Sequence, residues 1–252
     1  KTQIKIPSKK DQSQIENFLE NIEKKIENNI KINEKILELI NNIYDYWFLQ
    51  FNFPNENNVP YYSNNGKMIW NGKIKSNIPL NWSVLKLKEI IVKEKSTLKV
   101  KNDDFLLDGQ IPIIDQSNKF ISGYTNKKKY LIEVEKPVIV FGDHTRNLKL
   151  IDFNFARGAD GTKLIISKNK ELSQNLLYIK LMKIDLSNFG YARHFKFLKN
   201  CYLIIPDEHI ANKFDEVTSN LFHQMHLNTR QNIQLQKLQN WLLPYLMEGK
   251  LK

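Results

Sequence analysis

The sequence predicts an α+β protein in which a small, mostly β domain lies between two long helices. The stretch from Pro7 to Gln50 has apolar residues at the three- and four-residue spacing of a helix. The same pattern returns near the C-terminus at an offset of 206 − 7 = 199 residues, which aligns Pro7 with Pro206. Between the two copies, short apolar runs are separated by Gly, Pro and Asn, as is typical of short strands.

The internal repeat keeps its apolar phase along both copies. The aligned pairs are Ile15 with Phe214, Phe18 with Val217, Ile22 with Leu221, Ile26 with Met225, Ile36 with Leu235, Leu39 with Leu238, Ile43 with Leu242 and Tyr46 with Tyr245. Each copy begins with a proline and then a residue that can cap a helix, Ser8 in the first copy and Asp207 in the second. Two helices are therefore expected to begin just after these prolines.

The predicted helices are too long for an ordinary globular domain. About 40 helical residues span about 60 Å, and the first copy has no Gly or Pro between Ser8 and Gln50 to interrupt it. A coiled coil is the natural use of such an apolar stripe. The two copies could pack on each other or on a second chain. The simpler interpretation is that these helices serve only as dimerisation or spacer elements.

The first part of the middle region predicts a connector and one strand. Residues 51–67 are rich in Asn, Pro and Gly, which is typical of a connector. A turn is expected at Asn77–Pro79, and a strand is expected over Ser83–Leu87. The Lys-rich residues 88–102 are compatible with a loop or a short helix.

Residues 111–166 predict a series of short strands. Strands are expected in IPIID, in two parts of YLIEVEKPVIVFGD, and on both sides of a glycine loop over Arg157–Gly161, with a turn around Gly123. Residues 171–184 carry apolar side chains at helical spacing and predict a helix. A last strand precedes Pro206, so the middle domain is expected to be α+β.

The composition favours a polyanionic partner. The formal net charge is +11, from 38 Lys and Arg against 27 Asp and Glu, which is typical of proteins that bind DNA or RNA. An AT-rich genome, which enriches Lys, Asn and Ile, is the alternative explanation.

The one cysteine, Cys201, excludes a disulfide within the chain and a CxxC metal site. No 18-residue apolar run and no signal peptide are present, so we expect a cytoplasmic protein.

The sequence contains no convincing catalytic or metal-binding constellation. The run Arg157–Thr162 is glycine-rich but lacks the spacing of a phosphate loop, and a β-turn explains it better. Asp143 and His144 resemble an acid–base pair, but no nucleophile is marked beside them. His223 and His226 have helical spacing, which a solvated helix face explains better than a metal.

Several loop segments instead combine hydrogen-bonding and basic side chains suited to DNA. Arg and Asn can pair with base edges, while Lys and Thr more often contact phosphates. The chain has many lysines and few arginines, so an arginine in a loop indicates that the geometry of its guanidinium group matters there. The candidate DNA-contacting residues are Ser117, Asn118, Lys119, Tyr124, His144, Thr145, Arg146, Arg157, Arg193, His194 and Lys196. An ordinary solvated loop is the alternative for each of them.

The chain also resembles a known family over nearly its whole length. The stretches IKIPSKKDQSQIENFLENIEKKIENN and INEKILELINNIYDYWFLQF resemble the conserved region of specificity subunits from type I restriction-modification systems. The segment IPLNWSVLKLKEI resembles the opening of a target recognition domain, and GQIPIIDQSNKFISGYTNKKKYL and VIVFGDHTRNLKLIDFNFARGADGTKLI resemble its middle. YARHFKFLKNCYLIIPDEHIANKFDEV resembles the exit into the next conserved helix.

The resemblance implies a non-catalytic subunit with specific partners. In this family two target recognition domains each read half of a split DNA target, and the conserved helices between them pack as an antiparallel coiled coil. These helices hold methyltransferase subunits, which bring S-adenosylmethionine and methylate adenine, and a restriction and translocation subunit can join. No cofactor or metal is expected in this chain itself, and its direct partners are expected to be double-stranded DNA and the methyltransferase subunits.

This chain departs from the family pattern because it has two conserved helices but one recognition domain. The expected boundaries are residues 1–50 for the first helical arm, 51–206 for the target recognition domain and 207–252 for the second arm. Either the chain is the C-terminal half of a longer subunit, or it is a half-length subunit that dimerises through its helices. Two other functions stay open: a coiled-coil adaptor whose middle domain binds protein, and a diverged DNA methyltransferase or nuclease.

Overall fold

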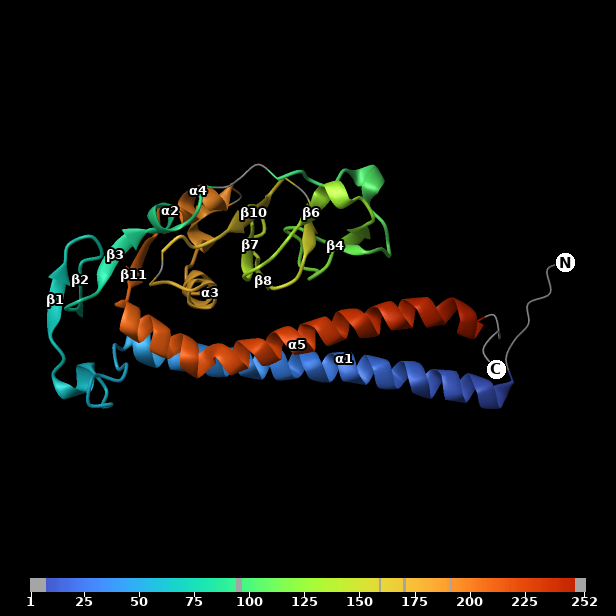
Figure 1. Ribbon diagram of the computed structural model, residues 1–252, viewed down its shortest axis with the longest axis horizontal. Coiled ribbons are helices and arrows are strands. Elements are labelled where there is room, and N and C mark those ends of the chain that lie inside the picture. The colour runs from blue at the N-terminus through green and yellow to red at the C-terminus, as the bar shows by residue number, and fades with distance from the viewer. Residues whose placement is uncertain (1–7, 94–96, 159, 170, 191, 248–252) are drawn as a thin grey trace. The chain divides into compact units, whose positions relative to one another are not determined.

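The computed structural model describes residues 8–93, 97–158, 160–169, 171–190 and 192–247. The chain divides into two compact units. One consists of Lys1–Asn42 and Ser219–Lys252, and the other of Ile43–Thr218. The α+β fold class predicted from the sequence is confirmed, because in chain order one long helix precedes the strand-rich segment and another follows it, as the colours in Figure 1 show. The predicted domain boundaries after residues 50 and 206 stay a prediction.

The two long helices begin at positions that the internal repeat makes equivalent. Helix α1 spans Lys9–Tyr44 and helix α5 spans Glu208–Met247, so their first residues are 208 − 9 = 199 apart. Both predicted caps are present. The Asp11 amide donates to Ser8 Oγ at 3.2 Å, and the Ile210 amide donates to Asp207 Oδ1 at 2.9 Å. Pro7, at the start of the first copy, lies outside the described residues.

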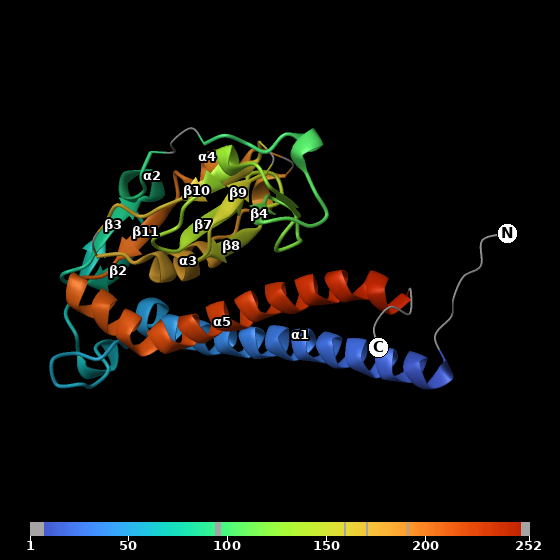
Figure 2. The same ribbon diagram turned by 45° about the vertical axis from the view of Figure 1, so that its right-hand side comes forward.

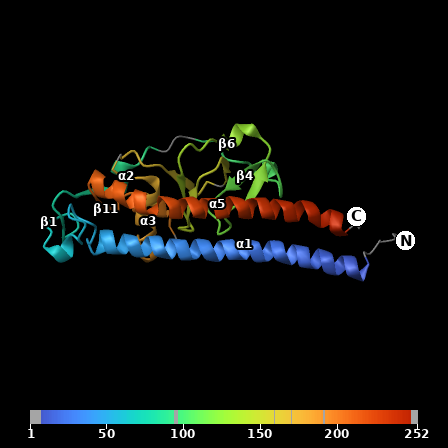
Figure 3. The same cartoon turned by 60° about the horizontal axis from the view of Figure 1, so that its bottom comes forward.

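Within the first unit, α1 and α5 pack side by side in opposite directions (Figures 1 and 3). The contacts between them run in opposite sequence order: Glu23 meets Gln239, and Asn33 meets Asn228. Ile22 is buried on the packed face of the helix pair, and polar residues occupy the outer faces. The predicted antiparallel helix pair is therefore confirmed. At its C-terminal end α1 continues into a π-helical turn over Asp45–Leu49, close to the end at Gln50 that the sequence predicts.

The described residues of the second unit form short strands in four small sheets. A hairpin pairs β1 (Met68–Asn71) with β2 (Ser76–Pro79), and β3 (Ser83–Lys86) pairs antiparallel with β11 (Tyr202–Ile205). The four-stranded sheet has the order β5 (Gly123–Thr125), β4 (Ile111–Ile114), β9 (Phe155–Arg157), β6 (Leu131–Ile132). The three-stranded sheet has the order β10 (Thr162–Ile165), β7 (Val138–Gly142), β8 (Leu148–Ile151).

Among the described residues, this unit also contains three short α-helices: α2 (Leu87–Ile90), α3 (Gln174–Met182) and α4 (His194–Leu198). Single turns of 3-10 helix lie at Tyr62–Asn64, Asn102–Asp104, Lys128–Tyr130 and Ser187–Phe189. Helix α3 was predicted, and it packs against β7 and β8 (Figure 2). Ser173 caps it by accepting a hydrogen bond from the Leu176 amide at 3.0 Å.

The core of the second unit fills the space around its two main sheets. One apolar cluster comprises Val100, Ile111, Ile113, Tyr130 and Ala156, and another comprises Ile114, Val138, Val140, Ile151 and Phe155. Strand β4 contributes to both clusters, because Ile113 and Ile114 point to opposite faces of the strand. Each strand has five or fewer residues, so tertiary packing rather than local propensity sustains it.

Several local predictions for the middle region were wrong. The expected turn at Asn77–Pro79 belongs to strand β2, and the expected turn around Gly123 opens strand β5. The β1–β2 hairpin and helix α4 were not predicted at all. The predicted glycine loop begins later than expected, because Arg157 is the last residue of strand β9. Strands β2 and β5 pair with the strands just before them, and β9 pairs with β4 and β6, so strand pairing outweighs the local turn-forming residues.

Candidate nucleic-acid interface

Several strands of the second unit end at one edge, and their turns carry polar side chains. Strands β4 and β9 run parallel, with Ile114 opposite Arg157, so their carboxyl ends coincide. Strands β7 and β10 are antiparallel, and the Asp143 amide donates to the Gly161 carbonyl at 2.7 Å, so the end of β7 and the start of β10 lie at this edge. We call the turns 115–119 and 143–147 and the start of α4 the polar rim.

Gln116 ties the two turns of the polar rim together. Its carbonyl oxygen accepts hydrogen bonds from Thr145 Oγ1 at 2.5 Å and from Asn147 Nδ2 at 3.1 Å. Its side-chain Oε1 lies 3.3 Å from the His144 amide, which donates to it. Asn147 Nδ2 also donates to Asn118 Oδ1 at 2.6 Å. The two turns are therefore held as one surface rather than as independent loops.

Two glycines allow this close approach. A Cβ at Gly142 would lie 2.1 Å from Thr145 Oγ1, and one at Gly161 would lie 2.2 Å from Gln116 Oε1. Real Cβ atoms do not come so close to another atom. A side chain at Gly142 would press on Thr145 and on the Gln116 backbone, and one at Gly161 would displace the Gln116 side chain that links the turns. The glycines thus serve packing at the rim, as expected where one backbone closely approaches another segment.

A buried lysine holds the turn 115–119 from its inner side. Lys149 Nζ donates to the carbonyl oxygens of Asp115, at 2.9 Å, and Lys119. Burial lowers the pKa of Lys149, while the Asp115 carboxylate, 4.0 Å away, opposes that shift. Burial alone would raise the pKa of Asp115, but hydrogen bonds from Ser122 and Ser117 outweigh it and the pKa is lowered. The turn is therefore fixed by buried polar contacts on its inner side.

Asp143 joins the second turn to helix α4. Its carboxylate accepts a hydrogen bond from the Phe195 amide at 2.8 Å, and its carbonyl accepts one from the His194 amide at 2.8 Å. The His194 ring is 1% exposed, with Nδ1 3.0 Å from the Asp143 carbonyl and Nε2 3.0 Å from the Gly190 carbonyl. His194 therefore connects backbone segments behind the surface.

Arg146 stands at the outer end of the second turn. Its backbone has φ 63°, in the left-handed region that non-glycine residues seldom adopt. Its side chain is exposed, and Nη1 donates to the Leu186 carbonyl at 3.4 Å. Arg146 also lowers the pKa of Asp185, after the larger contributions of hydrogen bonds from Ser187. The arginine is thus partly positioned while its outer face stays open to solvent.

No protein-family model matches the chain. Over 274 aligned positions, which cover 99% of this chain and 61% of the relative, it is 24% identical to the "Type I restriction enzyme MjaIX specificity subunit" of Methanocaldococcus jannaschii. The chain is similar in sequence to type I restriction-enzyme specificity subunits. The Escherichia coli EcoR124I/EcoR124II specificity subunit is 33% identical over 110 residues, or 42% of this chain and 27% of that protein.

A solved structure has a similar fold. The S subunit of a type I restriction-modification system from M. genitalium superposes with a TM-score of 0.58 at 16% identity, over 95% of this chain and 61% of that one. The chain thus spans about three fifths of the length of the M. jannaschii protein and of the M. genitalium chain.

Most of the predicted DNA-contacting residues lie at the polar rim. The exposed ones are Asn118, Lys119, Thr145, Arg146, Arg193 and Lys196. Ser117 and His144 are half-buried, and Ser117 is turned inward by its contact with Ser122, 3.2 Å between the two Oγ atoms. The exposed set combines four cations with an amide and a hydroxyl. Their role in DNA contact stays a prediction.

Three predicted residues are buried, which contradicts the loop positions assumed for them. Tyr124 lies within strand β5, 8% exposed, opposite Pro112 of β4. Arg157 ends strand β9, is 4% exposed, and donates from Nη1 to Thr97 Oγ1 at 3.2 Å. His194 is enclosed as described above. Strand pairing accounts for the burial of Tyr124 and Arg157, and the capping of α4 accounts for that of His194. None of the three lies on an open surface that could read bases.

Sequence reasoning missed the residues that shape the rim from inside. Gln116, Asp143 and Lys149 each hold two segments together, yet none was selected as a site residue. Gln116 and Asp143 stand directly beside selected residues, so their positions after apolar strands were an available signal. Lys149 lies in the middle of a strand, and nothing in the sequence separates it from the many exposed lysines.

In the part of the chain that the structure describes, no three His, Cys, Asp or Glu residues are grouped as metal ligands. Among the same residues, no helix is long and apolar enough to span a membrane. Cys201 is half-buried, its Sγ lies 3.5 Å from the Phe197 carbonyl, and burial raises the pKa of the thiol. A high thiol pKa fits a structural residue better than a nucleophile.

Proposed function

We propose that this chain is a DNA-reading module of a type I restriction-modification specificity subunit. The observation that carries the proposal is the similarity to the MjaIX specificity subunit, which runs through 99% of the chain and so includes both helices and the domain between them. The proposal assigns no catalytic step to this chain. Methyl transfer to adenine, with S-adenosylmethionine, is assigned to partner methyltransferase subunits, and a restriction subunit can join them in the cytoplasm.

The polar rim supplies chemistry that suits double-stranded DNA. Arg146 and Arg193 have planar guanidinium groups that can pair with the O6 and N7 atoms of guanine. Lys119 and Lys196 offer compact charges suited to phosphates. Asn118 can accept from and donate to an adenine edge. All five side chains are exposed. The formal charge of +11 would add a salt-dependent attraction that does not depend on sequence.

The helix pair is proposed to set spacing and to hold the methyltransferase subunits. A rigid antiparallel pair keeps a fixed distance along its length, which suits a target read in two separated halves. If the chain works as a half-length subunit, two copies would read two inverted copies of one half-site. If it works as part of a two-domain subunit, the two halves of the target would differ.

The deciding experiment is a genome-wide map of adenine methylation in the host with this gene intact and deleted. Loss of methylation at one split motif on deletion is the expected result, and it identifies the target. A symmetric motif supports a dimer of half-length subunits, and an asymmetric motif supports a two-domain subunit. Unchanged methylation, together with no duplex binding by the purified chain plus methyltransferase subunit at low salt, would overturn the proposal.

A further inference from the structure

The antiparallel helix pair contains four asparagines that the internal repeat makes equivalent. Asn29 and Asn33 of α1 align with Asn228 and Asn232 of α5 at the same 199-residue offset. Asn29 is 1% exposed and Asn228 is 6% exposed. A polar amide at a buried position between two helices is costly unless it is hydrogen-bonded. Each arm therefore carries the same polar pair, four residues apart, on its packed face.

The asparagines form two matching hydrogen bonds across the helix pair. Asn29 Nδ2 donates to Asn232 Oδ1 at 2.8 Å, and Asn228 Nδ2 donates to Asn33 Oδ1 at 2.8 Å. Exchanging the two copies of the repeat converts one bond into the other, donor into donor and acceptor into acceptor. The contact is thus two-fold symmetric although it joins two different helices.

The same symmetry extends to the backbone. Asn33 Nδ2 donates to the Met225 carbonyl at 3.2 Å, and Asn232 Nδ2 donates to the Ile26 carbonyl at 3.3 Å. Ile26 and Met225 are themselves equivalent in the repeat, 225 − 26 = 199. Every one of the four amides therefore donates across the interface, and two of them also accept. This complete pairing exists in one alignment of the helices.

Sliding one helix along the other by a heptad would destroy the pairing. In either direction the apolar stripes would still meet, because their period is close to seven residues. A slide one way would place Asn33, Asn228 and Asn232 opposite Leu235, Ile40 and Ile36, and a slide the other way would place them opposite Leu221, Ile26 and Ile22. Asn33, Asn228 and Asn232 would then face aliphatic side chains in place of their asparagine partners. The apolar stripe alone tolerates the slide, and the asparagines do not.

We propose that Asn29, Asn33, Asn228 and Asn232 are positioning residues that fix the register of the two arms. Their contribution is to the uniqueness of the alignment rather than to the strength of packing. A buried asparagine has this effect in coiled coils, where it specifies register at a cost in stability. The inference concerns the helix pair alone and does not depend on the proposed DNA-reading function.

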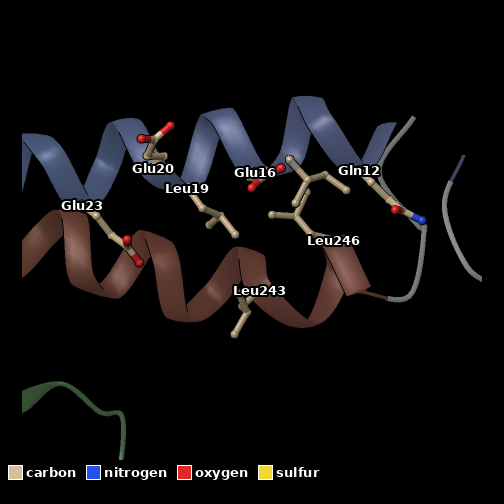
Figure 4. Close-up of a pocket in the computed structure, with 8 residues that line it drawn as sticks. Gln12, Glu16, Leu19, Glu20, Glu23, Leu243 and Leu246 are labelled. Carbon is tan, nitrogen blue, oxygen red and sulfur yellow. The ribbon is translucent and has the colours of Figure 1, made fainter. Parts of the chain in front are cut away.

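The register can be measured with cysteine pairs in the full chain carrying Cys201→Ser. Glu23 accepts a hydrogen bond from Gln239 at 3.0 Å, so Glu23→Cys with Gln239→Cys reports the observed alignment. Glu16→Cys with Gln239→Cys reports a slide of seven residues one way, and Glu23→Cys with Leu246→Cys reports the opposite slide. Figure 4 shows Glu16 and Glu23 at the end of the helix pair, with Leu19 and Leu246 between the helices.

The test compares these pairs in the native background and in a variant with all four asparagines changed to leucine. We expect disulfide formation only in the Glu23/Gln239 pair of the native background. In the leucine variant we expect disulfides in at least one shifted pair, with a thermal midpoint at or above that of the native chain. A variant with Asn29→Leu and Asn232→Leu keeps one polar pair. The yield of its shifted disulfides should be several-fold lower than in the four-leucine variant.

A matched control places leucines on the exposed face, with Asn21→Leu and Asn28→Leu. Both residues are exposed, so this variant should keep the native disulfide pattern. If the four-leucine variant forms only the native disulfide, the asparagines do not set the register and the proposal fails. If that variant loses its helical circular dichroism, the two-leucine variant decides, and an unchanged disulfide pattern there also overturns the proposal.

Discussion

The hydroxyl of Thr145 donates a 2.5 Å hydrogen bond to the carbonyl of Gln116, which lies 29 residues earlier in the chain. Replacing the hydroxyl with a methyl group of the same size removes this link between the two turns of the polar rim. We expect Thr145→Val to lower the free energy of unfolding by about 1 kcal/mol. Chemical denaturation measures this change. Thr145→Ser keeps the donor and should cost less, and equal losses in both variants would contradict the assignment.

Gly142 is expected to tolerate no side chain. Its Cβ would lie 2.1 Å from Thr145 Oγ1 and 3.2 Å from the Gln116 carbonyl oxygen, so Gly142→Ala should destabilise the chain by about 1–3 kcal/mol. Gly72 offers a matched control, because nothing lies within 4 Å of its Cβ position. Gly72→Ala should leave the thermal midpoint unchanged or slightly higher. Similar losses in both variants would show that close contact at the rim is not the cause.

The arginines of the rim are expected to carry sequence discrimination. Arg146→Ala or Arg193→Ala should weaken binding to the specific duplex by about 1–3 kcal/mol if the side chain pairs with a guanine edge. Binding to an unrelated duplex should change much less. Arg230, on helix α5, is the matched control, and Arg230→Ala should leave both affinities unchanged. Unaltered specific binding in both rim variants would remove these residues from the proposed interface.

The lysines of the rim are expected to contact phosphates. Lys119→Ala and Lys196→Ala should each weaken binding to all duplexes alike and reduce the slope of log affinity against log salt by about 1. Titrations at several salt concentrations give this slope. An effect confined to one sequence would assign the affected lysine to base recognition, and an unchanged slope would place it away from the DNA.

Lys180 makes the stability of the chain depend on pH. Burial lowers the pKa of its amine to about 7, and the amine lies over the rings of Tyr44 and Phe48 at 5.3 and 4.6 Å from their centroids. The unfolded amine has a pKa near 10.5 and binds more protons than the folded one above pH 7. Stability contributed by this group therefore rises with pH, by about 2 kcal/mol between pH 7 and pH 9.

The variant Lys180→Met isolates this effect. It should be more stable than the native chain at pH 6 to 7, and the difference should shrink as the pH approaches 10. Denaturation curves at four pH values, with the native chain measured alongside, test the expectation. Because other groups titrate equally in both proteins, their contributions cancel in the comparison. A constant difference across this range would show that the Lys180 amine keeps an ordinary pKa in the folded state.

The helical arms could be predicted from the sequence because their signals are local. Ser8 and Asp207 mark the starts, and the apolar spacing repeats every three or four residues, so no knowledge of distant contacts is needed. The repeat also disclosed that the arms are equivalent. What it left open was their pairing, because an apolar stripe alone is compatible with a second chain. The asparagine contacts within this chain supply that information.

The polar rim could be predicted only in part because it depends on long-range strand pairing. The residues 117–119 and 144–146 were selected from their side chains. Gln116 was not selected, since its role exists only when the turn after β4 lies against the turn after β7. His194 shows the opposite error. It stands in a basic, aromatic segment that suggests a surface, yet the capping of α4 by Asp143 encloses it.

The equivalent starts of α1 and α5 also have a consequence for synthesis on the ribosome. The second helix begins 199 residues after the first. At about 5–20 residues per second, the apolar stripe of α1 would wait about 10–40 s for the helix that covers it. The second unit is made within that interval and can fold first, while the nascent α1 depends on its charged faces, or on another protein, to avoid association. Neighbouring chains made on one messenger RNA would expose the same apolar stripe of α1 to each other.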